Sequence, residues 1–314
     1  MLIAGPNLTT DRTLRIDELR PGEVLRFSTA TITPGGKGVN VARVAGTMGF
    51  PAVLVALAPG RTGTAVADLL RDEGFDIVGV KTGGEVRAAS VILEDSGRVT
   101  VLNEPGPAVA SGEWDAYERA VETNLSGHGF LVCIGSLPPG SPLDAYARLV
   151  RLARSRGLRA LVDASGGQLA AALEAGPDMT TPNLAEVEGM LAGTESLPVD
   201  DSSPDVRPRA LAAGSELIAR GAGTALVTVG AAGVAVVAAS ERWWVEAPHV
   251  EGRNPIGAGD SLVAGLVGAL ERGGDLDGAV RTGVAAAAAS VETEIAGVVD
   301  RERVLELAAE LRNQ

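Results

Sequence analysis

A glycine-rich turn that contains an acidic residue lies near the carboxyl end of the chain. The residues Asn254-Pro-Ile-Gly-Ala-Gly-Asp260-Ser261 precede an apolar run, Leu262 to Leu270, whose large members recur at helical spacing. The turn therefore leads into a helix, and a helix start presents backbone N–H groups without partners together with partial positive charge. Glycines in such a turn let an anion approach the backbone closely. This stretch is suited to binding a phosphate.

Asp260 is not explained by anion binding, because its carboxylate would repel a phosphate. One interpretation is that Asp260 faces a neutral hydroxyl beside the phosphate and accepts its proton while the phosphoryl group is transferred. The alternative is that Asp260 caps the following helix, since Asp is a preferred capping residue. The stretch by itself favours neither interpretation.

A second glycine turn opens a helix near the start of the chain, Pro34-Gly-Gly-Lys37-Gly-Val-Asn40. Lys37 and Lys81 are the only lysines in the sequence. A lysine in a glycine-rich helix start suits a phosphate or a polyhydroxyl ligand, and a solvated charge is the alternative. The stretch is not a P-loop, which has four residues between its glycines and Ser or Thr after the lysine.

Polar residues also follow several expected strands. Asn7 and Asp11 come after the first strand, Asp163 ends a later one, and Asn183 and Glu186 open a helix after another. Ligands of open α/β sheets collect beyond the carboxyl ends of the strands. An amide and an acid three residues apart can order a Mg²⁺ ion and its waters, although Asn-x-x-Glu also matches ordinary helix capping.

The elements that must position these residues alternate along the chain. From Val53 onward, short apolar segments alternate with segments of helical spacing, which indicates one α/β domain over residues 1–314 with a mostly parallel β-sheet and helices on both faces. We expect strands at 2–5, 53–58, 131–135, 160–163, 178–181 and 225–229, and an edge hairpin at 233–237 and 242–245. We expect helices from 37 onward and at 63–73, 113–125, 143–156, 168–174, 184–192, 210–220, 276–294 and 301–311, with a surface loop at 195–209.

Two stretches interrupt this alternation with short β segments. Residues 14–16 with 24–27, and residues 87–93 with 99–102, each read as an antiparallel hairpin. We expect the two insertions, at about 12–33 and 86–103, to form a small β-sheet that stands off the main sheet. Such a sheet would cover a site or pair with a second copy of the chain.

The composition limits the kinds of partner and site. The formal net charge of -13 argues against nucleic acid or an anionic membrane as the main partner. No apolar run approaches about 18 residues and no basic region precedes an apolar segment, so the cytoplasm is the expected location. The one cysteine, Cys133, lies in an apolar strand and is expected to be buried and unreactive. Two histidines far apart in sequence give a zinc site little support.

The two glycine turns, in this order and separation, resemble the two signatures of the ribokinase-like (PfkB-type) carbohydrate kinases. The resemblance extends from Asn7 to about Ile295. Three further stretches are similar to the branch that phosphorylates sugar phosphates, which includes 1-phosphofructokinase, tagatose-6-phosphate kinase and the minor 6-phosphofructokinase. They are Asp11-Arg-Thr13, Asn103-Glu-Pro-Gly-Pro107 and Gly135-Ser-Leu-Pro-Pro-Gly140.

The resemblance implies an ATP-dependent kinase that transfers the γ-phosphate to a primary hydroxyl of a hexose phosphate, of the fructose 1-phosphate, fructose 6-phosphate or tagatose 6-phosphate class. A kinase of an unphosphorylated sugar or a nucleoside on the same fold is the alternative, and a weakly active sugar-binding protein is a third interpretation. The implied cofactors are ATP and Mg²⁺, together with a monovalent cation such as K⁺. The implied partner is a second copy, bound through the small sheet acting as a lid.

The resemblance also implies a role for each site residue. Asp260 would be the base, and Gly257, Ala258 and Gly259 would bind the charge in transfer. Lys37 and Arg87 would lie near the phosphate of a sugar held by Asp11, Gly35, Gly36, Lys37, Asn40 and Arg87. The nucleotide would lie against Asn183, Glu186, Thr228, Gly230, Gly233, Gly257 and Gly259, with Glu186 holding Mg²⁺ through water. The chain departs from the family where a lysine commonly stands, at Thr181, and where the lid often offers an asparagine, at Ala89.

Overall fold

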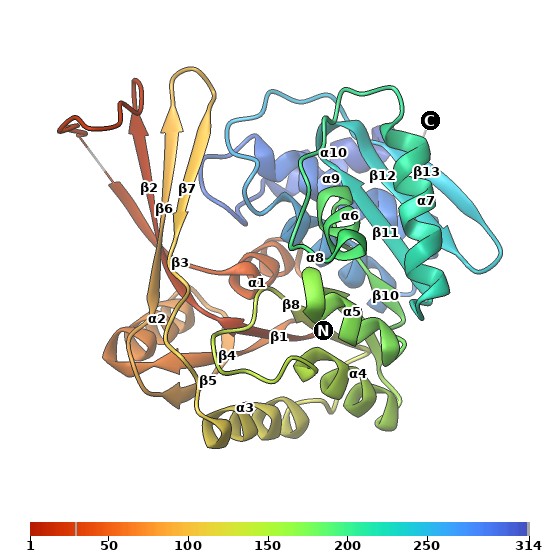
Figure 1. Ribbon diagram of the computed structural model, residues 1–314, viewed down its shortest axis with the longest axis horizontal. Coiled ribbons are helices and arrows are strands. Elements are labelled where there is room, and N and C mark those ends of the chain that lie inside the picture. Colours follow the sequence, from red (N-terminus) through yellow and green to blue (C-terminus); the bar gives the residue numbers. More distant parts are fainter. Residues whose placement is uncertain (29, 313–314) are drawn as a thin grey trace.

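A nine-stranded β-sheet forms the centre of the protein, as seen in a computed structural model that describes residues 1–28 and 30–312 (Figure 1). The strand order is β13-β12-β11-β10-β9-β8-β1-β4-β5, and all neighbours are parallel except β11–β12 and β12–β13. The strands are β1 (Leu2–Asn7), β4 (Val53–Pro59), β5 (Asp76–Thr82), β8 (Phe130–Ile134), β9 (Arg159–Asp163), β10 (Met179–Thr180), β11 (Thr224–Val229), β12 (Gly233–Ala238) and β13 (Arg242–Glu246). The mostly parallel sheet and its edge hairpin are confirmed.

Helices cover both faces of this sheet (Figure 1). Alternate residues of a strand face opposite sides, so in β8 the side chains of Phe130, Val132 and Ile134 enter one core and those of Leu131 and Cys133 the other. The first core includes α1 (Lys37–Met48), α2 (Gly60–Asp72), α8 (Ala258–Glu271), α9 (Leu276–Val291) and α10 (Arg301–Arg312). The second includes α3 (Ser111–Thr123), α4 (Ala145–Ser155), α5 (Gly166–Glu174), α6 (Leu184–Ala192) and α7 (Val206–Ala219). Cys133 is buried, as expected.

A separate four-stranded sheet, which we call the lid sheet, projects from the main body on the left of Figure 1. It has the order β3-β2-β6-β7 and consists of β2 (Thr9–Ile16), β3 (Ala30–Gly35), β6 (Arg87–Glu94) and β7 (Val99–Asn103). β2–β3 and β6–β7 are antiparallel, and β2–β6 is parallel. The predicted small β-sheet is therefore confirmed.

One predicted lid strand is wrong. Residues 24–27 form no strand, and the antiparallel partner of β2 is β3 instead. A turn at Pro21 and Gly22 precedes this segment, and Val24 is 81% exposed and Phe27 43% exposed, so neither side chain packs in a core. The alternation of apolar and polar residues predicted a strand with one buried face, but the apolar side chains of this segment are exposed.

Two further elements differ from the sequence prediction. β5 was not predicted, because it lies at the edge of the sheet, has several half-exposed positions and includes Gly79. The loop expected at 195–209 ends earlier, since α7 already begins at Val206. Pro208 lies in the first turn of α7, where a helix tolerates the missing N–H group of proline.

The strand order of the main sheet reverses at β1. β1 pairs with β4 on one side and with β8 on the other, so the strand order grows outward in both directions from this point. In open α/β sheets, ligands bind beyond the carboxyl ends of the strands at such a reversal. Asn7 ends β1 and Gly135 follows β8, which places both stretches at this edge. Within the described part of the chain, no helix combines the length and apolarity needed to cross a bilayer.

Candidate active site

The glycine turn at 257–259 forms the N-terminus of α8. Gly257 is the N-cap with φ 86°, a conformation that favours glycine, and Ala258 is the first helical residue. Asp260 lies in the first turn, is 4% exposed, and makes no capping hydrogen bond. The helix-capping interpretation of Asp260 is therefore wrong, because the cap is Gly257.

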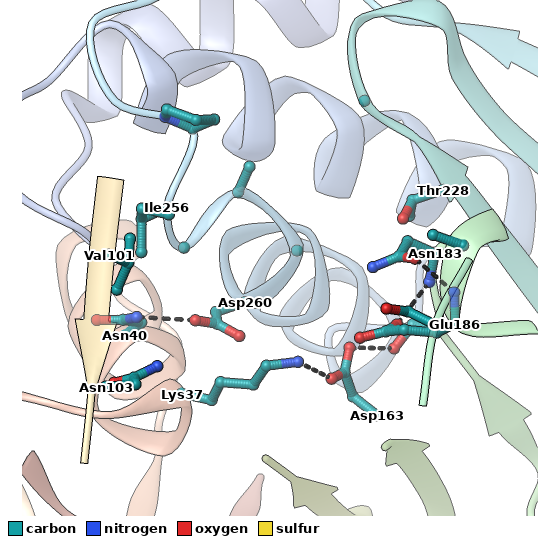
Figure 2. Close-up of a pocket in the computed structure, with 18 of the residues that line it drawn as sticks. Lys37, Asn40, Val101, Asn103, Asp163, Asn183, Glu186, Thr228, Ile256 and Asp260 are labelled. Carbon is teal, nitrogen blue, oxygen red and sulfur yellow. Dashed lines mark hydrogen bonds and ion pairs between the residues drawn. The ribbon is translucent and has the colours of Figure 1, made fainter. Parts of the chain in front are cut away.

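The Asp260 carboxylate is fixed by a neighbour from α1. Asn40 Nδ2 donates a hydrogen bond to Asp260 Oδ2 at 2.8 Å (Figure 2). Burial raises the pKa of Asp260 to about 7, and the carboxylates of Asp163 and Glu186 add to the rise, while Lys37 and the Asn40 hydrogen bond oppose it. A carboxylate whose pKa lies near neutral pH is a suitable general base, because it can both accept and release a proton.

Lys37 reaches across the floor of the pocket from the start of α1 (Figure 2). Its Nζ atom lies 2.6 Å from Asp163 Oδ1, and the side chain is 44% exposed to the pocket. Burial alone would lower the pKa of Lys37, but the carboxylates of Asp163, Asp260 and Glu186 outweigh it and raise the pKa above its usual value. Lys37 is therefore charged and lies near three acids. A lysine that merely extends into solvent at a helix start would have no such partners, so the ligand-binding interpretation is favoured.

Asp163 belongs to this centre, although the sequence alone gave it no role. It is 4% exposed, and its second carboxylate oxygen accepts a hydrogen bond from Thr181 Oγ1 at 3.1 Å. Its position at the carboxyl end of a buried strand was the available signal. Thr181 thus orients the acid that pairs with Lys37.

The start of α6 lies at the other end of the pocket (Figure 2). Asn183 is the N-cap of α6, and Asn183 and Glu186 form a capping box: Glu186 N donates to Asn183 Oδ1 at 2.8 Å, and Asn183 N donates to Glu186 Oε2 at 2.9 Å. Both side chains also line the pocket, beside Thr228 and Gly230. Burial raises the pKa of Glu186, an effect that Lys37 opposes. The capping interpretation is correct, and the box does not use Glu186 Oε1 or Asn183 Nδ2.

The lid sheet forms the opposite wall through one of its faces. Asp11, Ala89 and Asn103 are directly paired across β2, β6 and β7, and pocket-lining residues recur at every second position on either side of this row. The lining residues of the lid are Thr9, Asp11, Arg87, Ala89, Val91, Val101 and Asn103. Asn103 places an amide opposite Ala89. The sequence had indicated it only as the start of a stretch that resembles the sugar-phosphate kinases, and not as a site residue. The β2–β6 pairing that brings it there joins segments about 80 residues apart, which local periodicity does not show.

These walls enclose two cavities that share Lys37, Arg87, Asn103 and Glu186. The larger, of about 880 Å³, contains Asp260, the start of α8 and the start of α6. The smaller, of about 190 Å³, lies where β1 and β8 end and is lined by Asn7 and Ser136. Of the predicted site residues, Gly35 and Gly233 are absent from both linings. Gly35 packs on Asp11, and Gly233 packs on the backbone of β13.

Several buried polar atoms of this site have no partner. Among residues 1–28 and 30–312, Asp11 Oδ1, Asn40 Oδ1 and Arg87 Nε are buried side-chain atoms without a hydrogen bond. Burial raises the pKa of Asp11 and lowers that of Arg87, although their opposite charges partly offset both shifts. Buried polar groups are nearly always paired, so these atoms indicate a ligand rich in hydroxyl groups and negative charge.

The site can be compared with known proteins. The family model of the pfkB family carbohydrate kinases matches residues 7–300. The chain belongs to this family. It is 33% identical over 276 residues to ATP-dependent 6-phosphofructokinase isozyme 2 of Escherichia coli K12, covering 87% of this chain and 86% of that protein. It is 32% identical over 272 residues to 1-phosphofructokinase of Rhodobacter capsulatus, covering 86% of this chain and 83% of that one.

Solved structures agree with the family assignment. Phosphofructokinase-2 of Escherichia coli in complex with fructose-6-phosphate superposes with a TM-score of 0.85 and 27% sequence identity, covering 99% of each chain. The predicted ribokinase-like fold and the predicted ATP-dependent carbohydrate kinase are confirmed. The PfkB relatives thus favour a kinase over the weakly active sugar-binding protein.

Proposed function

We propose that this PfkB kinase transfers the γ-phosphate of ATP to a primary hydroxyl of a hexose phosphate. The observation that carries this proposal is the position of Asp260. The carboxylate is buried, held by Asn40, and placed at the N-terminus of α8, between the polar face of the lid sheet and the start of α6. In-line transfer requires the base to lie beside the acceptor hydroxyl and close to groups that bind the phosphoryl group. Here the lid sheet supplies the polar wall for the hydroxyl groups, and the start of α8 supplies the N–H groups for the phosphoryl oxygens.

Each group at the centre has one task in this proposal. Asp260 accepts the proton of the acceptor hydroxyl as that oxygen bonds to phosphorus. The backbone N–H groups at the start of α8 stabilise the phosphoryl oxygens that gain charge. The positive charge of Lys37 offsets the negative charges of Asp163, Asp260 and Glu186, which would otherwise repel the phosphoryl group at the site of transfer. Asn40 fixes the Asp260 carboxylate so that one oxygen remains for the acceptor.

The smaller cavity supports a substrate that already carries a phosphate. Arg87 lines both cavities, and its buried Nε has no partner. Asn7 and Ser136 meet at the same place, where Asn7 Nδ2 donates to the Ser136 carbonyl at 2.8 Å. A guanidinium beside hydroxyl and amide groups is suited to a phosphate. The sugar would then span from Arg87 to Asp260, with Asp11 and Asn40 available to its hydroxyl groups.

The residues at the start of α6 fit a magnesium nucleotide. Glu186 and Asn183 line the pocket beside Thr228 and Gly230, and their capping box does not use Glu186 Oε1 or Asn183 Nδ2. No cluster of three or more His, Cys, Asp or Glu suited to a metal occurs among the residues the structure describes, so Mg²⁺ would be held largely through water, with Glu186 as its acid. When bound, the ion neutralises charge on the phosphates. A K⁺ complex is known for one structural relative, phosphofructokinase-2 of Escherichia coli.

Arg87 separates a phosphosugar kinase from a kinase of a free sugar or nucleoside. Replacing it with Ala should raise KM for the accepted sugar phosphate by about 10-fold or more, because a charge-assisted contact to the phosphate is lost. Arg119→Ala is the control, since Arg119 is an exposed arginine of α3 that lines neither cavity. ATP turnover is measured with fructose 1-phosphate, fructose 6-phosphate, tagatose 6-phosphate and their unphosphorylated counterparts. Higher turnover on the unphosphorylated sugars would contradict the proposal.

We further propose that the lid sheet pairs with a second copy of the chain. Its outward face exposes Ile32 (59% exposed) and Leu102 (60% exposed), and a tetrameric form is known for phosphofructokinase-2 of Escherichia coli. Large apolar side chains on a free sheet are typical of an interaction surface. Sedimentation of wild type and of an Ile32→Asp, Leu102→Asp double variant should show a dimer only for wild type. A monomeric wild type at micromolar concentration would contradict this proposal.

A further inference from the structure

The loop that leads into α8 is held by the side chain of Asn254, which is 1% exposed. Asn254 Oδ1 accepts a hydrogen bond from Ile256 N at 3.0 Å, and Asn254 Nδ2 donates to the Glu294 carbonyl at 2.9 Å. The backbone N–H of Asn254 also donates to the Val291 carbonyl at 3.1 Å. Both ends of the amide are thus used, one within the loop and one on the segment that follows α9.

Glu294 connects this loop to the lid sheet. Its carbonyl accepts from Asn254, while its side-chain Oε1 lies 2.7 Å from Arg15 Nη2. Arg15 is on β2, the strand that also carries Asp11 on the pocket wall. An unbroken series of contacts therefore runs from the lid through Arg15, Glu294 and Asn254 to the start of α8.

The segment that includes Glu294 also touches the catalytic groups directly. A Cβ atom added to Gly297 would lie 2.6 Å from Asn40 Cα, and one added to Gly257 would lie 3.0 Å from Gly297 N. At these separations the backbone of one segment packs directly on the backbone of the other, and no flexible side chain lies between them to absorb a shift. A shift of residues 292–297 must therefore displace Asn40, which binds Asp260, or the turn at Gly257.

We propose that Asn254 is a positioning residue for the phosphoryl-transfer turn and that Arg15 and Glu294 make its position depend on the lid. The inference rests on the proposed function, in which the sugar phosphate binds to residues of the lid sheet. Sugar bound to Asp11 and Arg87 holds the lid in place, the Arg15–Glu294 pair then holds residues 292–297, and Asn254 holds the N–H groups of α8. The exposed Arg15–Glu294 pair contributes little to stability by itself, so its role is separable from folding.

Steady-state kinetics of a double-mutant cycle test this proposal. Asn254→Asp keeps the acceptor for Ile256 N and removes the donor to Glu294, so kcat should fall by about 10-fold or more while KM for the sugar phosphate changes by less than about 3-fold. Arg15→Gln should lower kcat by about 3-fold or more in wild type and should have no further effect in Asn254→Asp. Arg119→Gln, at an exposed position of α3, should leave kcat unchanged. Additive effects of Arg15→Gln and Asn254→Asp would overturn the proposal.

Hydrogen exchange of the free protein keeps the test independent of the substrate. Amides of residues 256–261 should exchange faster in Arg15→Gln than in wild type or Arg119→Gln, because the support of the turn is loosened. Equal exchange in the three proteins would overturn the coupling. If exchange rises but no sugar phosphate is turned over by wild type, the coupling stands and the proposed function fails. If Asn254→Asp does not fold, Asn254→Ser, whose side chain is too short to reach the Glu294 carbonyl, replaces it in the cycle with the same expected non-additivity.

Discussion

Replacing Asp260 with Asn is expected to lower kcat by about 10²- to 10⁴-fold, the range for loss of a positioned general base. The amide has nearly the same shape, so Asn40 and the first turn of α8 should keep their places. KM for the sugar phosphate should change little, because the groups proposed to bind its phosphate, Arg87 and Ser136, are untouched. Steady-state kinetics at saturating ATP measure both constants.

The matched control for this change is Asp277→Asn. Asp277 also lies in the first turn of a helix, α9, and its side chain is 52% exposed in an ion pair with Arg281. Its replacement should leave kcat within about 2-fold of wild type, since an exposed ion pair contributes little. Comparable losses in both variants would show that the effect of Asp260→Asn is structural.

Replacing Lys37 with Met is expected to lower kcat by about 10²- to 10³-fold, the effect of removing one electrostatic group from a preorganised site. The change leaves Asp163, Asp260 and Glu186 without the cation that faces all three. It also alters the pH dependence. Burial raises the pKa of Asp260 to about 7 and Lys37 opposes this rise, so kcat of wild type should fall as pH decreases through about 7, where the base becomes protonated.

In Lys37→Met this acid limb should move to higher pH, because an opposing charge is gone. Lys37→Arg keeps the charge and should retain the wild-type limb, and Lys81→Met changes the only other lysine, an exposed residue of β5. The measurement is kcat against pH from about 5.5 to 9 for the four proteins. An acid limb that stays in place, or moves to lower pH, in Lys37→Met would contradict the arrangement of charges.

The sequence predicted those parts of the site that depend on local patterns. The turn at Gly257 precedes a helix with clear periodicity, and Lys37 stands in a glycine turn that opens a second helix, so both anion-binding starts could be located. The alternation of apolar and helical segments likewise predicted the main sheet. Such features are readable because neighbouring residues determine them.

The remaining parts of the site depend on pairings between distant segments. The parallel pairing of β2 with β6 sets Asp11, Ala89 and Asn103 in one row, and no property of either strand alone indicates that register. Likewise, the ion pair of Lys37 with Asp163 joins residues 126 positions apart. The sequence showed an acid at a strand end and a lysine at a helix start, but their contact follows only from the order of β9 and β1 in the sheet.

The most direct test of Asp260 as the base is the rate of a single turnover by Asp260→Asn, on protein shown by calorimetry to bind the sugar phosphate. We expect the variant to bind the sugar phosphate within about 3-fold of the wild-type Kd and to transfer the phosphoryl group at least about 10² times more slowly. A variant that binds normally and transfers at the wild-type rate would contradict the role of Asp260 as the base.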